Sequence, residues 1–278
     1  MKLCPFRAYL VCNGQKRRAL PYAVKLKAFS QCVALFLVSV ASSTRQLKNS
    51  KTQKLKSMSR ELQITADGSH TLFIPEMNEH YHSVNGAAQE SMHIFINAGL
   101  RSLDKPVVRI MEVGFGTGLN ALLSLRESVE TGRKIEYYSA ELYPLGDDIV
   151  SKLNYGELLW SEGAHFFKEL HSAPWNECVD ITDSFTLCKI EGDIAKCDIP
   201  ENIDLIYFDA FAPEKQPEMW NEEIYRRLAS HTNDGGVIVT YCAKGDVRRG
   251  MQAAGFKMER LPGPPGKRHI LRGVLSCE

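Results

Sequence analysis

The stretch that decides the fold is Met111–Asn120, MEVGFGTGLN, in which three glycines alternate with other residues. An apolar run, 106–111, precedes the glycines, and a helix-compatible run, LNALLSLRESVE (119–130), follows them. A short apolar run ending at a glycine indicates a buried strand, and a longer run with helical spacing indicates a helix. The glycines therefore mark a strand-to-helix turn, which is where nucleotide-containing ligands bind in α/β proteins.

The glycine spacing excludes two kinds of phosphate-binding loop. A dinucleotide fingerprint requires its third glycine where Leu119 stands, because the glycines here are Gly114, Gly116 and Gly118. No Lys-Ser or Lys-Thr pair follows, so the turn is not a phosphate-cradling P-loop. The spacing suits S-adenosylmethionine instead, which has no phosphates and needs close backbone approach to its methionine and ribose portions.

Three acidic residues stand where three successive strands are expected to end. Glu112 lies just before the glycines, Glu141 ends the run 135–141, and Asp193 follows the run 184–191. Ligands of open α/β sheets bind at the carboxyl ends of strands. We expect Glu112 to pair with the ammonium of the cofactor, directly or through water. We expect Glu141 to accept hydrogen bonds from the ribose hydroxyls, and Asp193 to accept one from the adenine amine. Each acid alone could be a solvated strand end, but together they predict an S-adenosylmethionine site.

The rest of the globular part alternates strands and helices. This pattern predicts an α/β fold with a mostly parallel sheet covered on both faces. A hairpin around Asp67–Gly68 and a helix at about 87–100 come first, and two final segments flank the turn PGPPGK as a C-terminal antiparallel hairpin. Strands are expected at 107–113, 135–141, 184–191, 203–209, 237–242, 256–261 and 268–275, and helices at 118–130, within 146–171, at 217–230 and at 244–254.

Composition and charge divide the chain unevenly. Its 278 residues are 44% hydrophobic and 24% charged, which suits one soluble globular domain, expected at 58–278. Residues 1–57 carry twelve Lys or Arg and no acid. They could be a targeting segment, a disordered basic tail, or translated sequence upstream of a true start at Met58, which we favour; their apolar stretch is short for a membrane span. Residues 226–278 hold ten bases and four acids, so they form a basic zone in a globular part that is acidic as a whole.

Cysteine usage and histidine spacing bear on redox state and metals. None of the eight cysteines forms a C-x-x-C pair, so we expect free thiols in a reducing compartment, the cytoplasm. His80 and His82 are two residues apart, unlike the i, i+4 pair of a zinc peptidase helix, so no metal site is expected.

The fourth predicted strand ends in Asp209–Pro213, DAFAP, at the place where amine-methylating enzymes of this class carry an Asp/Asn-Pro-Pro-aromatic motif. An alkylamine has a reference pKa near ~10, and only its neutral form has a lone pair that can attack a methyl group. Asp209 could orient the N–H bonds of such an amine, and Phe211 could stack on a planar base. The alternative is a loop aspartate and a core phenylalanine.

A polar loop before the predicted helix 87–100 is a candidate lid. Residues 75–83 concentrate two histidines, two glutamates and a tyrosine, and Gln89 and Glu90 follow. A histidine or glutamate of this lid could accept a proton from the substrate. A hydrogen-bonded structural loop is the equally simple alternative.

Five separated blocks resemble, in order, the methyltransferase domain of the bifunctional tRNA-modifying protein MnmC and its stand-alone counterpart MnmD. They are 72–83 (LFIPEMNEHYHS), 86–91 (GAAQES), 112–120 (EVGFGTGLN), 208–215 (FDAFAPEK) and 262–268 (PGPPGKR). The resemblance spans about 62–275, although 146–183 match poorly. It implies a class I, Rossmann-like methyltransferase that converts 5-aminomethyl-(2-thio)uridine at the tRNA wobble position to the methylaminomethyl form.

The resemblance also implies roles for residues within its blocks. Thr117 and Asn120 join the cofactor loop. The substrate-binding candidates are Glu76, Asn78, His80, Tyr81, His82, Gln89, Glu90, Lys215, Lys267 and Arg268. The flavin-dependent oxidoreductase of bifunctional members follows the methyltransferase domain, and its FAD activity is not transferred to this chain.

The expected partner is the tRNA anticodon stem-loop. The phosphates of the stem could contact the basic zone 226–278, with Lys267 and Arg268 as the best candidates. The wobble base lies in a single-stranded loop, so rotating it into a pocket costs little free energy. A small-molecule amine methyltransferase and a non-enzymatic RNA-binding module are the alternatives. The sequence leaves open the 2-thiolation of the acceptor, the source of the aminomethyl precursor, the proton acceptor and the oligomeric state.

Overall fold

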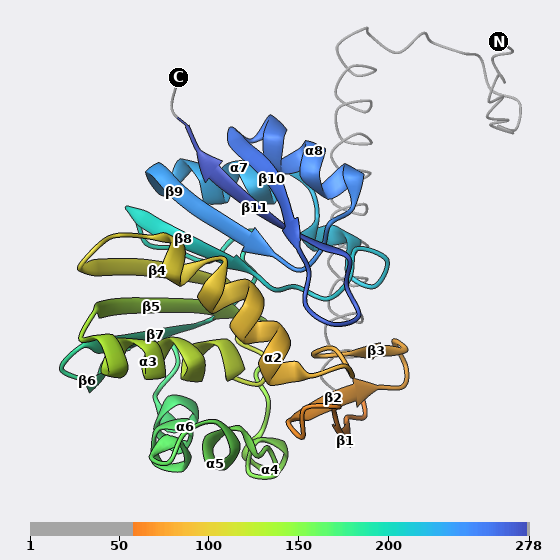
Figure 1. The fold of residues 1–278 in the computed structure, drawn as a ribbon, viewed down its shortest axis with the longest axis vertical. Coiled ribbons are helices and arrows are strands. Elements are labelled where there is room, and N and C mark those ends of the chain that lie inside the picture. The colour runs from red at the N-terminus through yellow and green to blue at the C-terminus, as the bar shows by residue number, and fades with distance from the viewer. Residues whose placement is uncertain (1–57, 277–278) are drawn as a thin grey trace, which may run out of the picture. The chain divides into compact units, whose positions relative to one another are not determined.

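The computed structural model describes residues 58–276, and the interpretations of residues 1–57 lie outside this range. Its centre is an eight-stranded sheet of order β10-β11-β9-β8-β4-β5-β7-β6 (Figure 1). Strands β4, β5, β7, β8 and β9 are parallel, whereas β11 is antiparallel to both of its neighbours and β6 is antiparallel to β7. The strands are β4 (Val107–Val113), β5 (Lys134–Glu141), β6 (Cys178–Thr182), β7 (Phe185–Glu191), β8 (Ile203–Phe208), β9 (Thr232–Thr240), β10 (Phe256–Pro262) and β11 (His269–Leu275).

Apolar side chains bury the central strands on both faces. All six residues of β8, IDLIYF, are buried, as expected for a parallel strand between two layers of helices. One apolar cluster joins the sheet to α3 (Leu119–Thr131) and α6 (Gly163–Ser172), and a second joins it to α7 (Glu222–Ser230) and α8 (Gly245–Ala253). The predicted α/β fold with helices on both faces is confirmed.

The order of the strands places a crevice beside β4. The chain runs outward from β4 to β5 and β7 on one side, then returns to pair β8 with the other side of β4. This reversal is a topological switch point, where the loops after two adjacent strands separate and leave room for a ligand. Glu112 lies near the end of β4 and Asp209 directly follows β8, so both predicted residues fall at this point.

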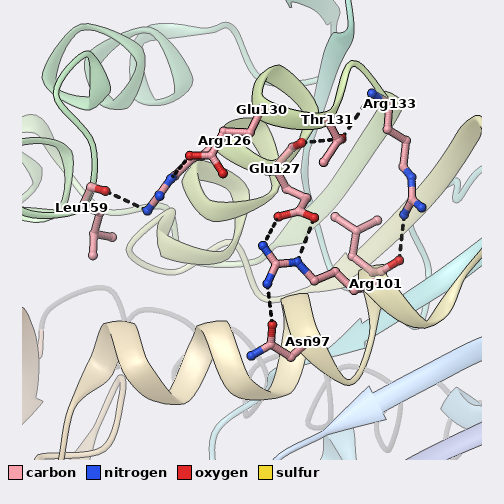
Figure 2. A network of polar contacts seen from close by, with 9 residues as sticks. Asn97, Arg101, Arg126, Glu127, Glu130, Thr131, Arg133 and Leu159 are labelled. Carbon is pink, nitrogen blue, oxygen red and sulfur yellow. Dashed lines mark hydrogen bonds and ion pairs between the residues drawn. The ribbon is translucent and has the colours of Figure 1, made fainter.

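Arginine side chains connect the segment 87–102 to helix α3 by hydrogen bonds, as Figure 2 shows. The predicted helix 87–100 is a short α-helix, α2 (Ala87–Ser91), continued by a π-helix (Met92–Asn97) and a 3₁₀ turn (Leu100–Ser102). From this turn Arg101 donates two hydrogen bonds to Glu127 of α3, at 2.9 and 2.7 Å, and a third to Asn97. The bidentate pair fixes the segment that carries the lid against the helix that begins at the glycine turn.

Residues 61–80, the extension that precedes the main sheet, form a small separate sheet. The predicted hairpin joins β1 (Glu61–Ile64) to β2 (His70–Ile74), and the two-residue strand β3 (Glu79–His80) adds to β2. Expected helical material between 146 and 171 forms α4 (Asp147–Val150), α5 (Tyr155–Leu159) and α6. A 3₁₀ turn (Pro217–Met219) precedes α7. Strand β9 begins five residues before the prediction because it pairs with β8 at Thr232 and again from Val237, with a register shift over the residues between them.

The expectation that the cysteines are free thiols is wrong for one pair. Strand β6, which the sequence did not indicate, pairs with β7 so that Cys178 stands directly opposite Cys188, with 4.2 Å between their Cα atoms. Directly opposed residues on antiparallel strands come close enough for a disulfide, and the structure contains one here. Cys197 and Cys242 are free. Over residues 58–276, no helix has the length and apolar character needed to cross a membrane.

Candidate active site

A cavity of about 350 Å³ lies at the switch point. Its walls come from the glycine turn after β4, the ends of β5, β7 and β8, and the lid loop between β3 and α2. The predicted site residues that line it are Gly114, Gly116, Glu141, Asp193, Asp209, Phe211, His80, Tyr81, His82, Glu90 and Lys267. Residues from cofactor, catalytic and lid predictions therefore meet in one cavity.

The glycine turn needs residues without side chains at two positions. Gly114 has a φ of +95°, and a Cβ atom there would stand 3.2 Å from the backbone oxygen of Asp209. Gly116 has a φ of +51°, and a Cβ atom there would reach within 3.4 Å of the Tyr81 ring. Positive φ favours glycine at both positions, and the nearby Asp209 backbone restricts Gly114 further. The bare backbone of this turn forms part of the cavity wall.

Two strand-end carboxylates face the cavity in fixed positions. Glu141 accepts hydrogen bonds from the backbone N–H groups of Gly116 at 3.0 Å and Tyr143 at 2.8 Å. Asp193 accepts one from the backbone N–H of Ala195 at 3.0 Å and forms an ion pair with Lys196 at 2.8 Å. These contacts orient each carboxyl group, and ionised carboxylates accept hydrogen bonds from hydroxyl or amine hydrogens.

Glu112 lies beneath the cavity and does not line it. Its side chain is buried and accepts hydrogen bonds from Ser139 Oγ at 2.6 Å and Asn120 Nδ2 at 3.0 Å. Burial raises the pKa of Glu112 to about 8, and the nearby Asp209 adds to the increase. Direct contact with a ligand ammonium, one of the two expected arrangements, is therefore not what this geometry provides.

Asn120 connects Glu112 to the carboxyl group that does line the cavity. Its Nδ2 also donates to Asp209 Oδ2 at 2.8 Å, so one amide holds both carboxyl groups. Burial raises the pKa of Asp209 to about 7, although the hydrogen bond from Asn120 acts in the opposite direction. A carboxyl group with a pKa near neutrality can both orient N–H bonds and accept a proton.

The loop after Asp209 is held by hydrogen bonds to its backbone. Tyr241 donates from its hydroxyl to the Ala210 oxygen at 2.8 Å, and Trp220 donates from Nε1 to the Phe211 oxygen at 2.6 Å. The ring of Phe211 meets Tyr81 edge to face, with 5.0 Å between centroids. The two rings form an aromatic wall on which a planar base could stack.

The lid contributes one half-buried histidine, His82, to the cavity wall. Burial lowers the pKa of His82 to about 4, so the ring is neutral at neutral pH. Its Nε2 lies 3.5 Å from Thr117 Oγ1, and its Nδ1 has no hydrogen-bond partner among residues 58–276. His80 is oriented differently, because its Nε2 contacts Gln63 of β1 at 3.0 Å.

Lys267 lines the cavity, and its ammonium forms an ion pair with Glu90 Oε1 at 2.6 Å. Arg268, the next residue, is exposed. Several other bases of the zone 226–278 also have carboxylate partners: Arg226–Glu222, Lys244–Glu214, Arg249–Asp246 and Arg272–Glu259. The zone is therefore less free to meet phosphates than its composition suggested.

Several predicted site residues lie outside the cavity wall. Glu76 accepts hydrogen bonds from Ser59, and the backbone N–H of Gln89 donates to Asp67, so both belong to the scaffold of the extension. Thr117 is buried and its backbone oxygen contacts His171 Nε2 at 3.1 Å. The full set outside the lining is Glu112, Thr117, Gly118, Asn120, Glu76, Asn78, Gln89, Lys215 and Arg268.

Sequence reasoning missed other residues of the cavity wall. Tyr143 follows Glu141, and Tyr241 follows β9, so their positions just past strand ends could have indicated them. Glu79 was part of the polar loop but received no role. Gln216 and Met219 lie in the segment before α7, where nothing in the local pattern pointed to a cavity.

Comparison with known proteins gives a consistent picture. Residues 164–276 match the model of a family described as S-adenosyl-L-methionine-dependent methyltransferase. The bifunctional protein MnmC of Pseudomonas syringae pv. tomato is 31% identical over 222 residues, which are 72% of this chain and 32% of that protein. MnmC of Pseudoalteromonas atlantica is 28% identical over 78% of this chain and 34% of its own length. The chain thus spans about a third of these relatives.

A solved structure supports the fold. MNMC2 from Aquifex aeolicus superposes with a TM-score of 0.64 at 23% identity, covering 89% of this chain and 85% of that one. The chain is therefore related to the methyltransferase domain of the MnmC proteins and has the class I, Rossmann-like fold of S-adenosylmethionine-dependent methyltransferases.

Proposed function

We propose that the chain methylates the primary amine of 5-aminomethyl-(2-thio)uridine at the wobble position of tRNA, with S-adenosylmethionine as methyl donor. The observation that carries the proposal is the single cavity that contains both a donor half and an acceptor half. Glu141 and Asp193 line the donor half beside the glycine turn, and Asp209 and Phe211 line the acceptor half. The names of the MnmC relatives refer to tRNA 5-methylaminomethyl-2-thiouridine biosynthesis, which supports the same substrate.

The donor half fits the proposed cofactor. Gly114 and Gly116 leave bare backbone in the cavity wall, where side chains would meet Asp209 or Tyr81. The carboxylate of Glu141 suits two ribose hydroxyls, and that of Asp193 suits an exocyclic amine. S-adenosylmethionine supplies an electrophilic methyl group attached to a sulfonium.

The acceptor half can hold the amine in its reactive form. Asp209 can accept hydrogen bonds from the amine N–H groups and so direct the nitrogen lone pair toward the donor half. The substrate ammonium must lose a proton before its nitrogen can attack; as the N–C bond then forms, the S–C bond breaks and the sulfonium leaves as the neutral thioether of S-adenosylhomocysteine. Asp209 can take up that proton because its pKa is about 7.

The proposed substrate implies contacts between the protein and the tRNA backbone. The exposed Arg268 lies next to the cavity residue Lys267 and is retained as a phosphate contact on the anticodon stem-loop. A wobble base is unpaired in the free anticodon loop, so turning it into a cavity costs little. Because its proposed substrate is tRNA, we expect the protein to act in the cytoplasm.

The test is methyl transfer to defined tRNA. Purified protein is incubated with isotopically labelled S-adenosylmethionine and tRNA that carries 5-aminomethyluridine at the wobble position, and the digested nucleosides are analysed by mass spectrometry. We expect label in 5-methylaminomethyluridine only. Transfer to free small amines at the same rate, with none to tRNA, would contradict the proposal.

A further inference from the structure

An ion pair inside the acceptor half of the cavity has no part in the chemistry described above. Lys267 Nζ lies 2.6 Å from Glu90 Oε1, and Glu90 Oε2 accepts a hydrogen bond from the backbone N–H of Ser83 at 2.9 Å. Glu90 is buried, and 28% of the Lys267 side chain is exposed. Among the described residues that line the cavity, Lys267 is the only lysine or arginine.

The turn that carries Lys267 is built to present it there. Lys267 donates its backbone N–H to Pro264 at 2.9 Å, and a Cβ atom on Gly263 would collide with the backbone of Lys267. Gly266 has a φ of +85° and packs against Asn85 of the lid loop. His93 Nε2 contacts the Pro262 oxygen at 2.8 Å and ties the turn to the π-helix. Lys267 is thus held in a defined place by contacts on two sides of the turn.

The ammonium of Lys267 retains hydrogen-bonding capacity toward the cavity. An ammonium has three N–H donors, and one of them is directed at Glu90. Its nitrogen also lies 5.0 Å from the centroid of the Tyr241 ring, whose hydroxyl holds the loop after Asp209. Lys267 and Asp209 both line the cavity, so the remaining N–H donors of Lys267 share it with the proposed methylation point. A ligand group that meets these donors must be a hydrogen-bond acceptor.

We propose that Lys267, held by Glu90, selects the acceptor base by donating a hydrogen bond to the ring carbonyl oxygen next to the carbon that carries the aminomethyl group. This inference rests on the proposed function. With the amine at Asp209 and the ring against Phe211 and Tyr81, the neighbouring ring position comes to the same end of the cavity. A uracil-type ring has a carbonyl there and accepts the bond. A cytosine-type ring has an amino group there, whose N–H bonds would face those of Lys267.

The experiment compares two anticodon stem-loops that differ in that one group. One carries 5-aminomethyluridine at the wobble position and the other 5-aminomethylcytidine. Dissociation constants are measured by fluorescence anisotropy with S-adenosylhomocysteine present, and kcat/KM with S-adenosylmethionine. For the wild type we expect a preference for the uridine form of roughly 10- to 100-fold, the range for a hydrogen bond from a charged group.

The variants separate selection from general binding. Lys267→Met should bring the preference below about 3-fold, mainly through weaker binding of the uridine form, and Lys267→Arg should keep most of it. Glu90→Gln should lower the preference because it releases the ammonium. The matched control is Arg268→Met, which should weaken both stem-loops equally and leave their ratio unchanged.

The outcomes distinguish this inference from the proposed function. Absence of a preference in the wild type, or an undiminished preference in Lys267→Met, would overturn the role of Lys267. Wild-type protein that methylates neither stem-loop would instead contradict the proposed function. Calorimetric binding of S-adenosylhomocysteine shows that each variant is folded, and the ratio of dissociation constants can be measured even for a variant without activity.

Discussion

At the scale of single residues, the site depends on a buried and a half-buried carboxyl group, Glu112 and Asp209, that share one amide. Asn120 Nδ2 donates to Glu112 at 3.0 Å and to Asp209 at 2.8 Å. Both carboxyl groups have raised pKa values because they are removed from water, to about 8 for Glu112 and about 7 for Asp209. Only Asp209 lines the cavity, so the two groups have different roles.

Replacing Asp209 tests its role in catalysis. Asp209→Asn keeps the size of the side chain but removes its ability to accept a proton, so kcat should fall by roughly 10²- to 10⁴-fold. The affinity for S-adenosylmethionine, measured by calorimetry, should change little because Glu141 and Asp193 remain. Wild-type kcat in this variant would refute the role given to Asp209.

The raised pKa of Glu112 predicts how the stability of the folded protein depends on pH. Its folded-state pKa is about 8 and its ordinary value 4.5, so between these values the folded protein retains a proton that the unfolded chain releases. Stability should therefore fall as pH rises through this window. Because glutamine does not ionise, this fall in stability should be smaller in Glu112→Gln. Each kcal/mol of stability that is kept corresponds to roughly 2–4 °C in Tm. Thermal unfolding between pH 5 and 8 measures it, and parallel curves for both proteins would contradict it.

At the scale of elements, the glycine turn and the loop after β8 constrain each other. Gly114 is close to the Asp209 backbone, and the backbone N–H of Asp209 donates to the Val113 oxygen at 3.2 Å. The periodic patterns of the sequence predicted both elements, because a strand, a glycine turn and a helix each have a local signature. Contacts between distant residues, such as Glu90 with Lys267, have no such signature and could not be predicted.

Adding one methyl group to the turn should disturb both of its neighbours. Gly114→Ala combines a φ of +95° with a Cβ atom 3.2 Å from the Asp209 oxygen. We expect a loss of about 1–3 kcal/mol in stability and weaker binding of S-adenosylmethionine. Gly132→Ala is the matched control, because its φ of +70° is similar and a Cβ atom there meets nothing within 4 Å. Equal effects on cofactor binding in the two variants would contradict the close approach.

The disulfide between β6 and β7 should affect stability and leave the cavity unchanged. Neither Cys178 nor Cys188 lines the cavity, and β6 is an edge strand. Cys178→Ser in non-reducing buffer should lower stability by about 1–3 kcal/mol and leave the KM for S-adenosylmethionine unchanged. Chemical denaturation and steady-state kinetics measure the two effects. A changed KM would show that the disulfide shapes the cavity.

At the scale of the whole molecule, strand order determines where the chemistry can occur. The chain places β4 between β5 and β8, and the acids after these strands therefore gather at one edge of the sheet. From their positions at predicted strand ends, the sequence predicted that Glu112, Glu141 and Asp193 gather there, with Asp209 at the end of a fourth strand. It could not show that Glu112 lies beneath the cavity, because burial of one strand residue depends on side chains from neighbouring strands such as Ser139.

The central claim is that one cavity holds a methyl donor against strand-end carboxylates and directs it toward Asp209. A crystal structure with S-adenosylhomocysteine tests this most directly. We predict the ribose hydroxyls on Glu141, the adenine amine near Asp193, and the sulfur facing the Asp209 carboxyl group. S-adenosylhomocysteine bound away from the glycine turn, or with its sulfur directed away from Asp209, would contradict the account.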